Sequence, residues 1–174
     1  MAYPHTHELR LPLEKYRVNG VSFGDDCSYE GVHWGIHLGE DVIYRAGTKV
    51  FSTGRGKVVY AKLHAGTSEK GNWGNVIIIA HKHPKTKKVF FALYGHLGKV
   101  FAKKGDRVEL GQKIGLVGKL NTPENGFWKT EHLHFAIFTG PWNRKVLPGY
   151  FKKGQKRTKL KWWKGPSKFI KNYR

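Results

Sequence analysis

The sequence has a single cysteine among its 174 residues, Cys27, so an internal disulfide framework is excluded. Long apolar runs are also missing, because the strongest, Val76–Ala80, is far shorter than the roughly 20 residues that a membrane-spanning helix needs. Residues 1–16 contain no apolar segment of the kind that an export signal has. Cysteine usage and the N-terminal residues therefore leave the cellular compartment and the export route open.

Helical periodicity is absent too, and no stretch repeats apolar residues every three to four positions over a useful length. From residue 31 onward, short runs rich in Val, Ile, Phe and Tyr are separated by Gly, Asn and charged turns at roughly ten-residue intervals. This spacing predicts an all-β domain of mainly antiparallel sheet, of the barrel-sandwich type. We expect three segments: residues 1–30 wrap the domain, 31–141 form it, and 142–174 are a basic aromatic extension.

Acidic residues are missing from residues 132–174, where Lys and Arg occur twelve times, so this stretch carries +12 of the net charge of +20. Such charge favours a polyanionic partner: an anionic cell-envelope polymer, a membrane surface or nucleic acid. Two other readings stay open. The charge can simply aid solubility, and Trp162 and Trp163 can pack back onto the sheet.

Histidines are abundant, and two of them, His132 and His134, flank Leu133 in an apolar run. In a strand, residues i and i+2 point to the same face, so these two imidazoles project together. A second pair, His81 and His83, runs into a proline and several lysines. That pair predicts the solvated tip of a hairpin, where neighbouring ammonium groups oppose a metal cation.

A further constellation places His37 and Asp41 four residues apart, with Gly39 between them to let the backbone bend. Together with one histidine of the pair at 132 and 134, they offer two nitrogens and one oxygen. Three protein ligands and one open position are typical of a catalytic zinc site, whereas a closed structural site uses four ligands, usually with cysteines. The spacing does not decide which histidine of the pair is the ligand. His96 ends another apolar run and is a candidate non-ligand histidine of the same site.

These stretches resemble, in order, the motifs of the M23 family of zinc metallopeptidases, the lysostaphin-type and LytM-type enzymes that cut peptide bonds in peptidoglycan. The resemblance extends from about residue 31 to residue 138. It is carried by "HLGED", "AGTKVFSTGRGKVVYA", "GNWGNVIIIAH", "YGHL", "KKGDRVELGQKIGLVG" and "EHLHF".

The resemblance implies that His37, Asp41 and His134 bind one Zn²⁺ and that His132 and His96 are the catalytic histidines. His132 would be the general base, while His96 would orient it or stabilise the oxyanion. The sequence departs from the family's pattern around the last motif. Glu131 precedes it, either to orient a histidine or as a surface residue, and Ala136 stands where the family has an acidic residue.

The function that the resemblance implies is hydrolysis of stem-peptide or cross-bridge bonds in peptidoglycan by an endopeptidase acting outside the cytoplasm, as a monomer. Gly-rich loops at 64–74 and 118–126 would form the walls of a narrow groove. Trp73, Trp128 and Tyr94 are the candidate substrate contacts.

Three alternatives remain at this point. A non-catalytic M23-like domain would bind or activate an envelope partner, but such domains lose zinc ligands, and here every position is filled. A nucleic-acid-binding protein would use the basic and aromatic residues near the C-terminus. A biotinyl or lipoyl carrier would share the turns of residues 103–118, but it needs a lysine hairpin that this chain lacks.

Overall fold

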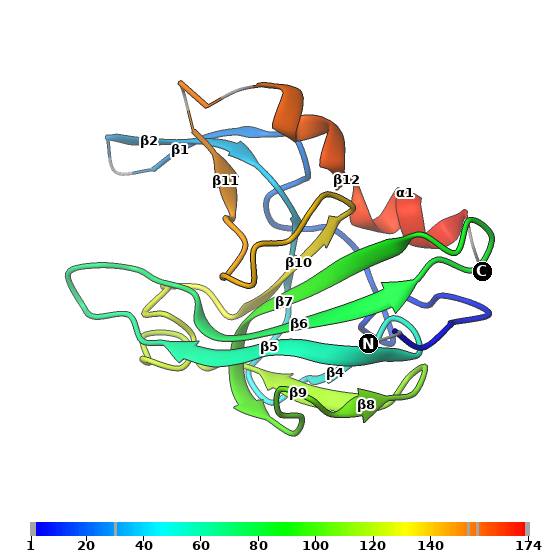
Figure 1. Cartoon of the computed structure of the whole chain (residues 1–174). Coiled ribbons are helices and arrows are strands. Elements are labelled where there is room, and N and C mark those ends of the chain that lie inside the picture. The colour runs from blue at the N-terminus through cyan, green and yellow to red at the C-terminus, as the bar shows by residue number, and fades with distance from the viewer. Residues whose placement is uncertain (1–2, 30, 153, 156, 173–174) are drawn as a thin grey trace.

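The computed structural model describes residues 3–29, 31–152, 154–155 and 157–172 (Figure 1). Among these residues, nine strands form the main sheet, three form a small second sheet, and one 3₁₀ turn and one short helix lie near the C-terminus. Every pairing between strands is antiparallel. The predicted all-β class is confirmed.

The main sheet has a continuous path of six strands, and three more strands pair beside it. The path runs in the order β12 (Trp163–Lys164), β10 (His132–Phe138), β7 (Val89–Val100), β6 (Gly74–Lys82), β5 (Gly56–His64) and β8 (Arg107–Val108). Beside it, β3 (Glu40–Ile43) pairs with β10, and β9 (Lys113–Val117) pairs with both β7 and β4 (Lys49–Phe51).

Both faces of this sheet are covered, which explains why its central strands are apolar without alternation. On β6, Ile77 and Ile79 face one buried cluster, and Val76, Ile78 and Ala80 face another. β-branched side chains suit such a doubly packed pleated surface. The central strands are therefore rigid supports for the residues at their ends.

A small second sheet lies over one end of the main sheet (Figure 1). It consists of β1 (Asp26–Tyr29), β2 (Val32–His37) and β11 (Tyr150–Phe151), with β2 in the middle. Gly35 of β2 has φ of 101°, and a Cβ there would overlap the carbonyl oxygen of Phe151. Only glycine permits this approach, so Gly35 allows β11 to join β2.

Both terminal segments pack onto the domain. Leu9, Leu11 and Leu13 are buried in the first cluster, as the predicted wrapping segment requires. Toward the C-terminus, a 3₁₀ turn η1 (Arg157–Trp162) leads to β12 and then to the short helix α1 (Pro166–Lys171). Trp163 and Ile170 from this region are buried, so its described part is structural in spite of its charge. The division at residues 30 and 141 stays a prediction.

The pair at His81 and His83 is not the solvated hairpin tip that its neighbours suggested. His81 lies within β6 with no exposed surface, its ring stacked on Phe90 at 5.0 Å, and His83 is 5% exposed. Long-range packing explains the error, because Phe169 of α1 contacts His83 and His5 bridges to Lys82. No helix among the described residues is long and apolar enough to span a membrane.

Candidate metal centre and active site

Three ring and carboxylate atoms converge where the two sheets meet. His134 Nδ1 lies 2.9 Å from Asp41 Oδ1 and 3.1 Å from His37 Nε2, and His37 Nε2 lies 3.4 Å from Asp41 Oδ1. His37 and His134 are fully or almost fully buried, and Asp41 is 8% exposed. Among the described residues, this is the one cluster of His, Cys, Asp and Glu suited to hold a metal ion.

Strand geometry brings the three candidate ligands together, although His37 and His134 are 97 residues apart in the sequence. Asp41 of β3 is paired directly opposite His134 of β10, so the two side chains share one face. His37 ends β2, and Gly39 lies in the turn to β3. A Cβ on Gly39 would lie 2.5 Å from His134 Nε2, so glycine is required here by close approach.

The donor set fits a zinc ion. Tetrahedral Zn²⁺ with bonds near 2.1 Å separates its ligand atoms by about 3.4 Å, close to the three distances observed. His37 Nδ1 lies 3.1 Å from the carbonyl oxygen of Ser22, which can only accept, so this nitrogen carries the proton and Nε2 presents a lone pair. His134 Nε2 is buried without a partner among the described residues, which leaves its ring oriented by the cluster alone.

The electrostatics of the cluster also suit a cation. Burial alone would raise the pKa of Asp41, but the close ring nitrogens of His134 and His37 hold it well below its usual range. Burial lowers the pKa of His134, opposed by the neighbouring Asp41. The site therefore presents an ionised carboxylate at Asp41 and a neutral imidazole at His134, which are the forms that coordinate metals.

Two more histidines lie beside the ligands, and their rings are 4.5 Å apart between centroids. His132 Nδ1 lies 3.0 Å from the carbonyl oxygen of Thr130, and His96 Nδ1 lies 3.0 Å from that of Asn125. Both rings must donate through Nδ1, so both keep a lone pair on Nε2. Burial, together with His132 and His134, lowers the pKa of His96 well below its ordinary value. His96 is therefore neutral near pH 7.

His96 also has an uncommon backbone conformation, with φ of 62°. A left-handed conformation costs a residue with a Cβ of order 1 kcal/mol or more and persists where surrounding contacts impose it. Here the backbone amide of His96 donates to the Trp73 carbonyl, and its own carbonyl accepts from Gly118. The strained residue is thus fixed on both sides.

Asn125 connects His96 and His132. Its backbone carbonyl accepts from His96, and its side-chain Nδ2 donates to the same Thr130 oxygen that His132 contacts. Its Oδ1 accepts from the Trp128 amide at 2.8 Å. Asn125 has no exposed surface, and sequence reasoning missed it because these bonds join loop residues with no periodic pattern.

The two Gly-rich loops form one wall of the site, not two facing walls. Asn72 and Gly126 are joined by a backbone hydrogen bond of 2.9 Å, and the Trp128 indole donates to the Asn72 carbonyl at 2.7 Å. Trp73 contacts His134 at 4.9 Å between ring centroids, and Trp128 contacts His96 at 5.7 Å. Both predicted tryptophans therefore line the site.

Two aromatic residues of the small sheet were missed by sequence reasoning. Trp34 of β2 contacts Trp128 at 5.7 Å, and Tyr150 of β11 contacts His37 at 5.2 Å. Trp34 precedes His37 by three residues and shows no motif of its own. Tyr150 reaches the site only because β11 pairs with β2, which no local pattern reveals.

Tyr94 does not reach the site. Its side chain is fully buried in the core, and its hydroxyl accepts from the Thr53 amide at 2.9 Å. A direct contact with substrate is incompatible with this position. Glu131 is partly exposed, and its carboxylate accepts from the Ala46 amide at 2.8 Å and from that of Leu120 at 3.4 Å, so these bonds go to loop backbone and not to a histidine. It joins two loops at the start of β10.

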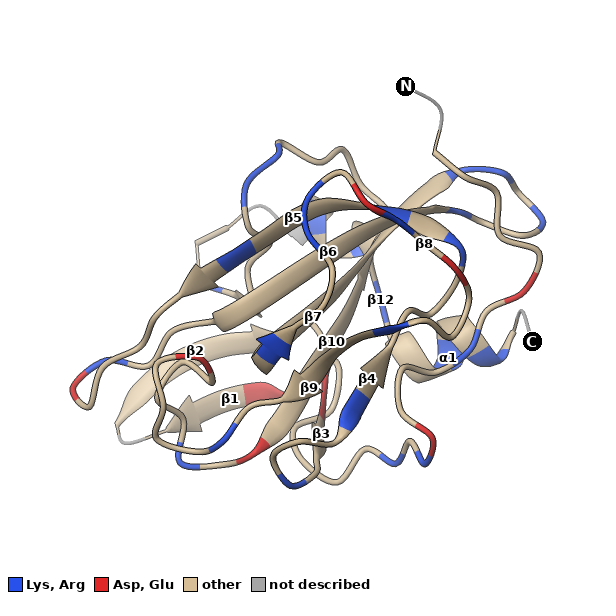
Figure 2. Ribbon diagram, turned by 90° about the horizontal axis from the view of Figure 1, so that it is seen from below, with Lys and Arg blue, Asp and Glu red and all other residues tan. Residues whose placement is uncertain are grey.

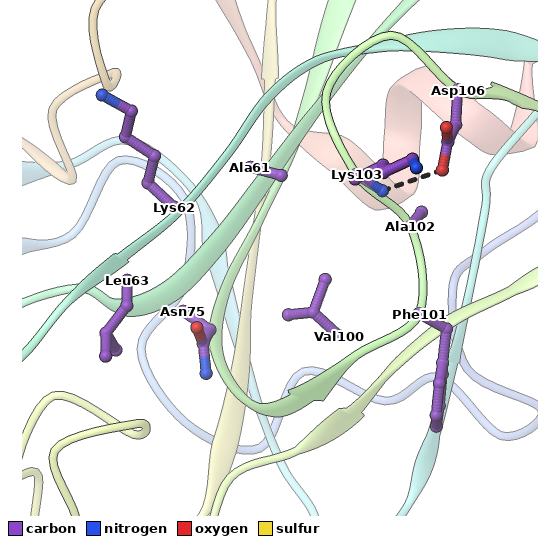
Figure 3. Close-up of a pocket in the computed structure, with 9 residues that line it drawn as sticks. All are labelled: Ala61, Lys62, Leu63, Asn75, Val100, Phe101, Ala102, Lys103 and Asp106. Carbon is purple, nitrogen blue, oxygen red and sulfur yellow. Dashed lines mark hydrogen bonds between the residues drawn. The ribbon is translucent and has the colours of Figure 1, made fainter.

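A hollow of about 540 Å³ lies elsewhere on the main sheet and contains no residue of the metal cluster (Figure 3). Leu63, Val100 and Phe101 supply its apolar surface, and Lys62 and Lys103 lie at its edge. The cluster of His37, Asp41 and His134 is therefore distinct from this hollow.

The sequence signature of peptidase family M23 matches residues 35–146, which is more than half of the chain and includes all five site residues. The chain belongs to peptidase family M23. The resemblance seen in the motifs is thereby confirmed, and the fold is that of M23 catalytic domains.

Named relatives agree with this assignment. The chain is 36% identical over 101 residues to the peptidoglycan DD-endopeptidase ShyB of Vibrio cholerae, which covers 58% of this chain and 20% of the relative. It is 33% identical over 105 residues to lysostaphin of Staphylococcus simulans, and the aligned region covers 60% of this chain and 18% of lysostaphin. It thus spans about a fifth of the length of these relatives.

Solved structures extend the similarity beyond the sequence motifs. The lysostaphin catalytic domain superposes with a TM-score of 0.55 at 28% identity, covering 87% of this chain and 90% of that one. A zinc-containing peptidase from Vibrio cholerae superposes with a TM-score of 0.58 at 30% identity, and the superposition covers 75% of this chain and 36% of that one. The chain therefore corresponds in extent and fold to the lysostaphin catalytic domain.

Proposed function

We propose that this protein is a zinc endopeptidase that hydrolyses peptide bonds in bacterial peptidoglycan. The observation that carries the proposal is the convergence of His37 Nε2, Asp41 Oδ1 and His134 Nδ1, within 3.4 Å of one another, beside two non-ligand histidines. A domain that only bound the envelope would not need this complete set.

The metal would supply Lewis acidity, lowering the pKa of a bound water toward 7 and polarising the scissile carbonyl. The protein's own groups then handle the proton. His132 Nε2 carries a lone pair because Nδ1 donates to Thr130, so His132 is the proposed general base for the attacking water. The fixed Nδ1 bond also sets the ring's orientation.

His96 has the same tautomer, so in its neutral form Nε2 accepts a proton and does not donate one. Its lowered pKa, caused by burial and by His132 and His134, disfavours a charge on the resting enzyme. A developing oxyanion nearby would offset that cost. We assign to His96 donation to the oxyanion or the leaving amine after it has gained a proton.

The surroundings of the site support a slender peptide substrate. Trp73 and Trp128 line one wall, and Trp34 and Tyr150 come from the small sheet, so aromatic rings occupy positions where side-chain pockets would lie. The Trp34 indole nitrogen is buried without a hydrogen-bond partner among the described residues. Relatives are named for DD-peptide and glycyl-glycine bonds. Stem or cross-bridge peptides are the proposed substrates.

We propose that the enzyme acts outside the cytoplasm as a monomer and that its charge favours contact with anionic envelope polymers. Lys and Arg are spread over strands, loops and α1 (Figure 2). The described residues of the C-terminal region pack on the domain, so the charge that they carry lies on its surface. Such attachment should weaken as salt rises, because charges beyond about 8 Å are screened at physiological ionic strength.

Digestion of purified peptidoglycan, with the released fragments identified by mass, tests this function. The wild-type protein should bind one zinc ion and release soluble fragments whose masses show cleavage of a stem or cross-bridge peptide bond. Replacing His132 or His96 by alanine should preserve zinc binding but lower the rate by about a hundredfold or more. Bound zinc with no fragments from several wall types would favour a non-catalytic envelope-binding domain instead.

A further inference from the structure

The segment His37–Asp41, which carries two of the three ligands, is enclosed by parts of the chain outside the family match at 35–146. On one side lie residues 20–25. Four backbone hydrogen bonds of 2.8–3.2 Å join them to His37 and Asp41, and the Ser22 carbonyl also accepts from the His37 ring. The N-terminal segment therefore fixes both ligands at the main chain.

On the other side lie residues just beyond the match. The Leu38 amide donates to the Gly149 carbonyl at 2.9 Å, and Tyr150 is paired directly opposite His37 in the small sheet. The ligand-bearing segment is thus held between an N-terminal and a C-terminal part of the chain.

Glu40 joins the two parts. Its carboxylate accepts from the Tyr16 hydroxyl at 2.8 Å and from the Ser167 hydroxyl at 2.7 Å, and the Ser167 amide lies 3.1 Å away. Tyr16 belongs to the N-terminal segment, and Ser167 lies in the first turn of α1. One side chain therefore ties both terminal parts to β3.

The chemistry of this junction is unusual for a residue that serves stability alone. Glu40 is 5% exposed, and its donors are a phenol, an aliphatic hydroxyl and a backbone amide, all uncharged. Burying a carboxylate among neutral donors stabilises a fold less than a well-packed apolar side chain of similar size. Glu40 is also adjacent to Asp41 on a strand of four residues.

We infer that Glu40 is a positioning residue for the metal centre, acting through β3 on Asp41. Neighbouring strand residues point to opposite faces, so Glu40 anchors one face of β3 while Asp41 presents Oδ1 to His134 on the other. Anchoring by Tyr16 and Ser167 fixes the position of β3. The residues outside the family match are thereby working parts of the zinc site.

The test is a measurement of zinc affinity by competition with a chromogenic chelator, together with the melting temperature of the metal-free protein. Ser167→Ala and Glu40→Ala should weaken zinc binding about tenfold or more, the usual scale for groups that orient metal ligands. Glu40→Gln should remain within about threefold of wild type, because its amide oxygen can accept from Ser167 while the Tyr16 hydroxyl reorients.

Thr139→Val is the matched control. The Thr139 hydroxyl donates to the Trp162 carbonyl at 2.8 Å, so this change removes a hydroxyl bond to the C-terminal region without touching β3. It should lower the melting temperature and leave zinc affinity unchanged. If Glu40→Ala does not fold, Ser167→Ala decides.

The inference rests on the proposed zinc site, and the two can fail separately. A wild-type protein that binds no zinc would refute the proposed function. If wild type binds zinc and both Ser167→Ala and Glu40→Ala bind it equally tightly, only the role of Glu40 is overturned. The same conclusion follows from variants that lose melting temperature with no change in zinc affinity, because that pattern describes a purely structural anchor.

Discussion

His81 should make the protein acid-labile. It has no exposed surface, its Nδ1 donates to the Arg55 carbonyl at 3.0 Å, and its Nε2 is buried without a partner among the described residues. Burial lowers the pKa of His81 from 6.5 to about 4, against the opposing effect of the Arg55 hydrogen bond. A proton added to this ring must enter a site with no counter-charge.

The magnitude follows from linkage. Between pH 6.5 and 4 the unfolded chain protonates His81 and the folded chain does not, so the unfolded state binds more protons and the free energy of unfolding falls as pH falls. The shift is about 2.5 pKa units, which at 1.36 kcal/mol per unit is roughly 3 kcal/mol. The loss should be complete near pH 4 and level off below it.

His81→Asn is the informative variant, because an amide nitrogen can keep the bond to Arg55 and does not titrate. Urea unfolding followed by circular dichroism from pH 7 to pH 4 should show wild type losing about 3 kcal/mol more than the variant. His7, whose ring is exposed, supplies the control His7→Asn, which should follow wild type. Parallel curves for wild type and His81→Asn would refute the reasoning.

Two other changes test the site and the C-terminal region. Gly39→Ala should abolish most zinc binding, because the added Cβ would lie 2.5 Å from His134 Nε2. The metal content of the purified variant measures this, and a normal zinc content would show that the turn can relax. Removing the chain from residue 157 onward should lower stability by more than about 3 kcal/mol, seen as a fall in melting temperature, because Trp163 and Ile170 leave the core. An unchanged melting temperature would restore the view of a solvated basic tail.

The local sequence pattern was sufficient to predict which side chains of a single strand share a face. The alternation at 132–138 places His132 and His134 on one face and Leu133 on the other, and the structure has this arrangement. Local pattern could not decide which of the two histidines faces Asp41. That choice came from the family resemblance, and its physical basis is the strand register that sets Asp41 opposite His134.

Errors arose where distant segments cover a residue. His83 reads as exposed from its neighbours Pro84 and Lys85, yet α1 packs against it through Phe169. For residues 142–174 the sequence left open whether the charge binds an anionic partner or the tryptophans pack on the sheet, and the buried Trp163 shows that the described part packs. Charge density describes what a segment shows to solvent, whereas its few apolar residues decide where it packs.

The buried Asn125 has a consequence for the lifetime of the protein. Asn125 precedes Gly126, and the asparagine of an Asn-Gly pair deamidates readily in a flexible chain. In that reaction the glycine nitrogen attacks the side-chain carbonyl carbon and ammonia leaves. In the folded protein that carbonyl accepts from Trp128, and the Gly126 nitrogen donates to Pro123 at 3.1 Å, so the two groups are held apart in separate bonds. Each unfolding event exposes the pair, and deamidation would turn the donor that supports Thr130 into an acceptor. Time spent unfolded would therefore be recorded covalently, as a growing fraction of chains that refold without a properly supported His132.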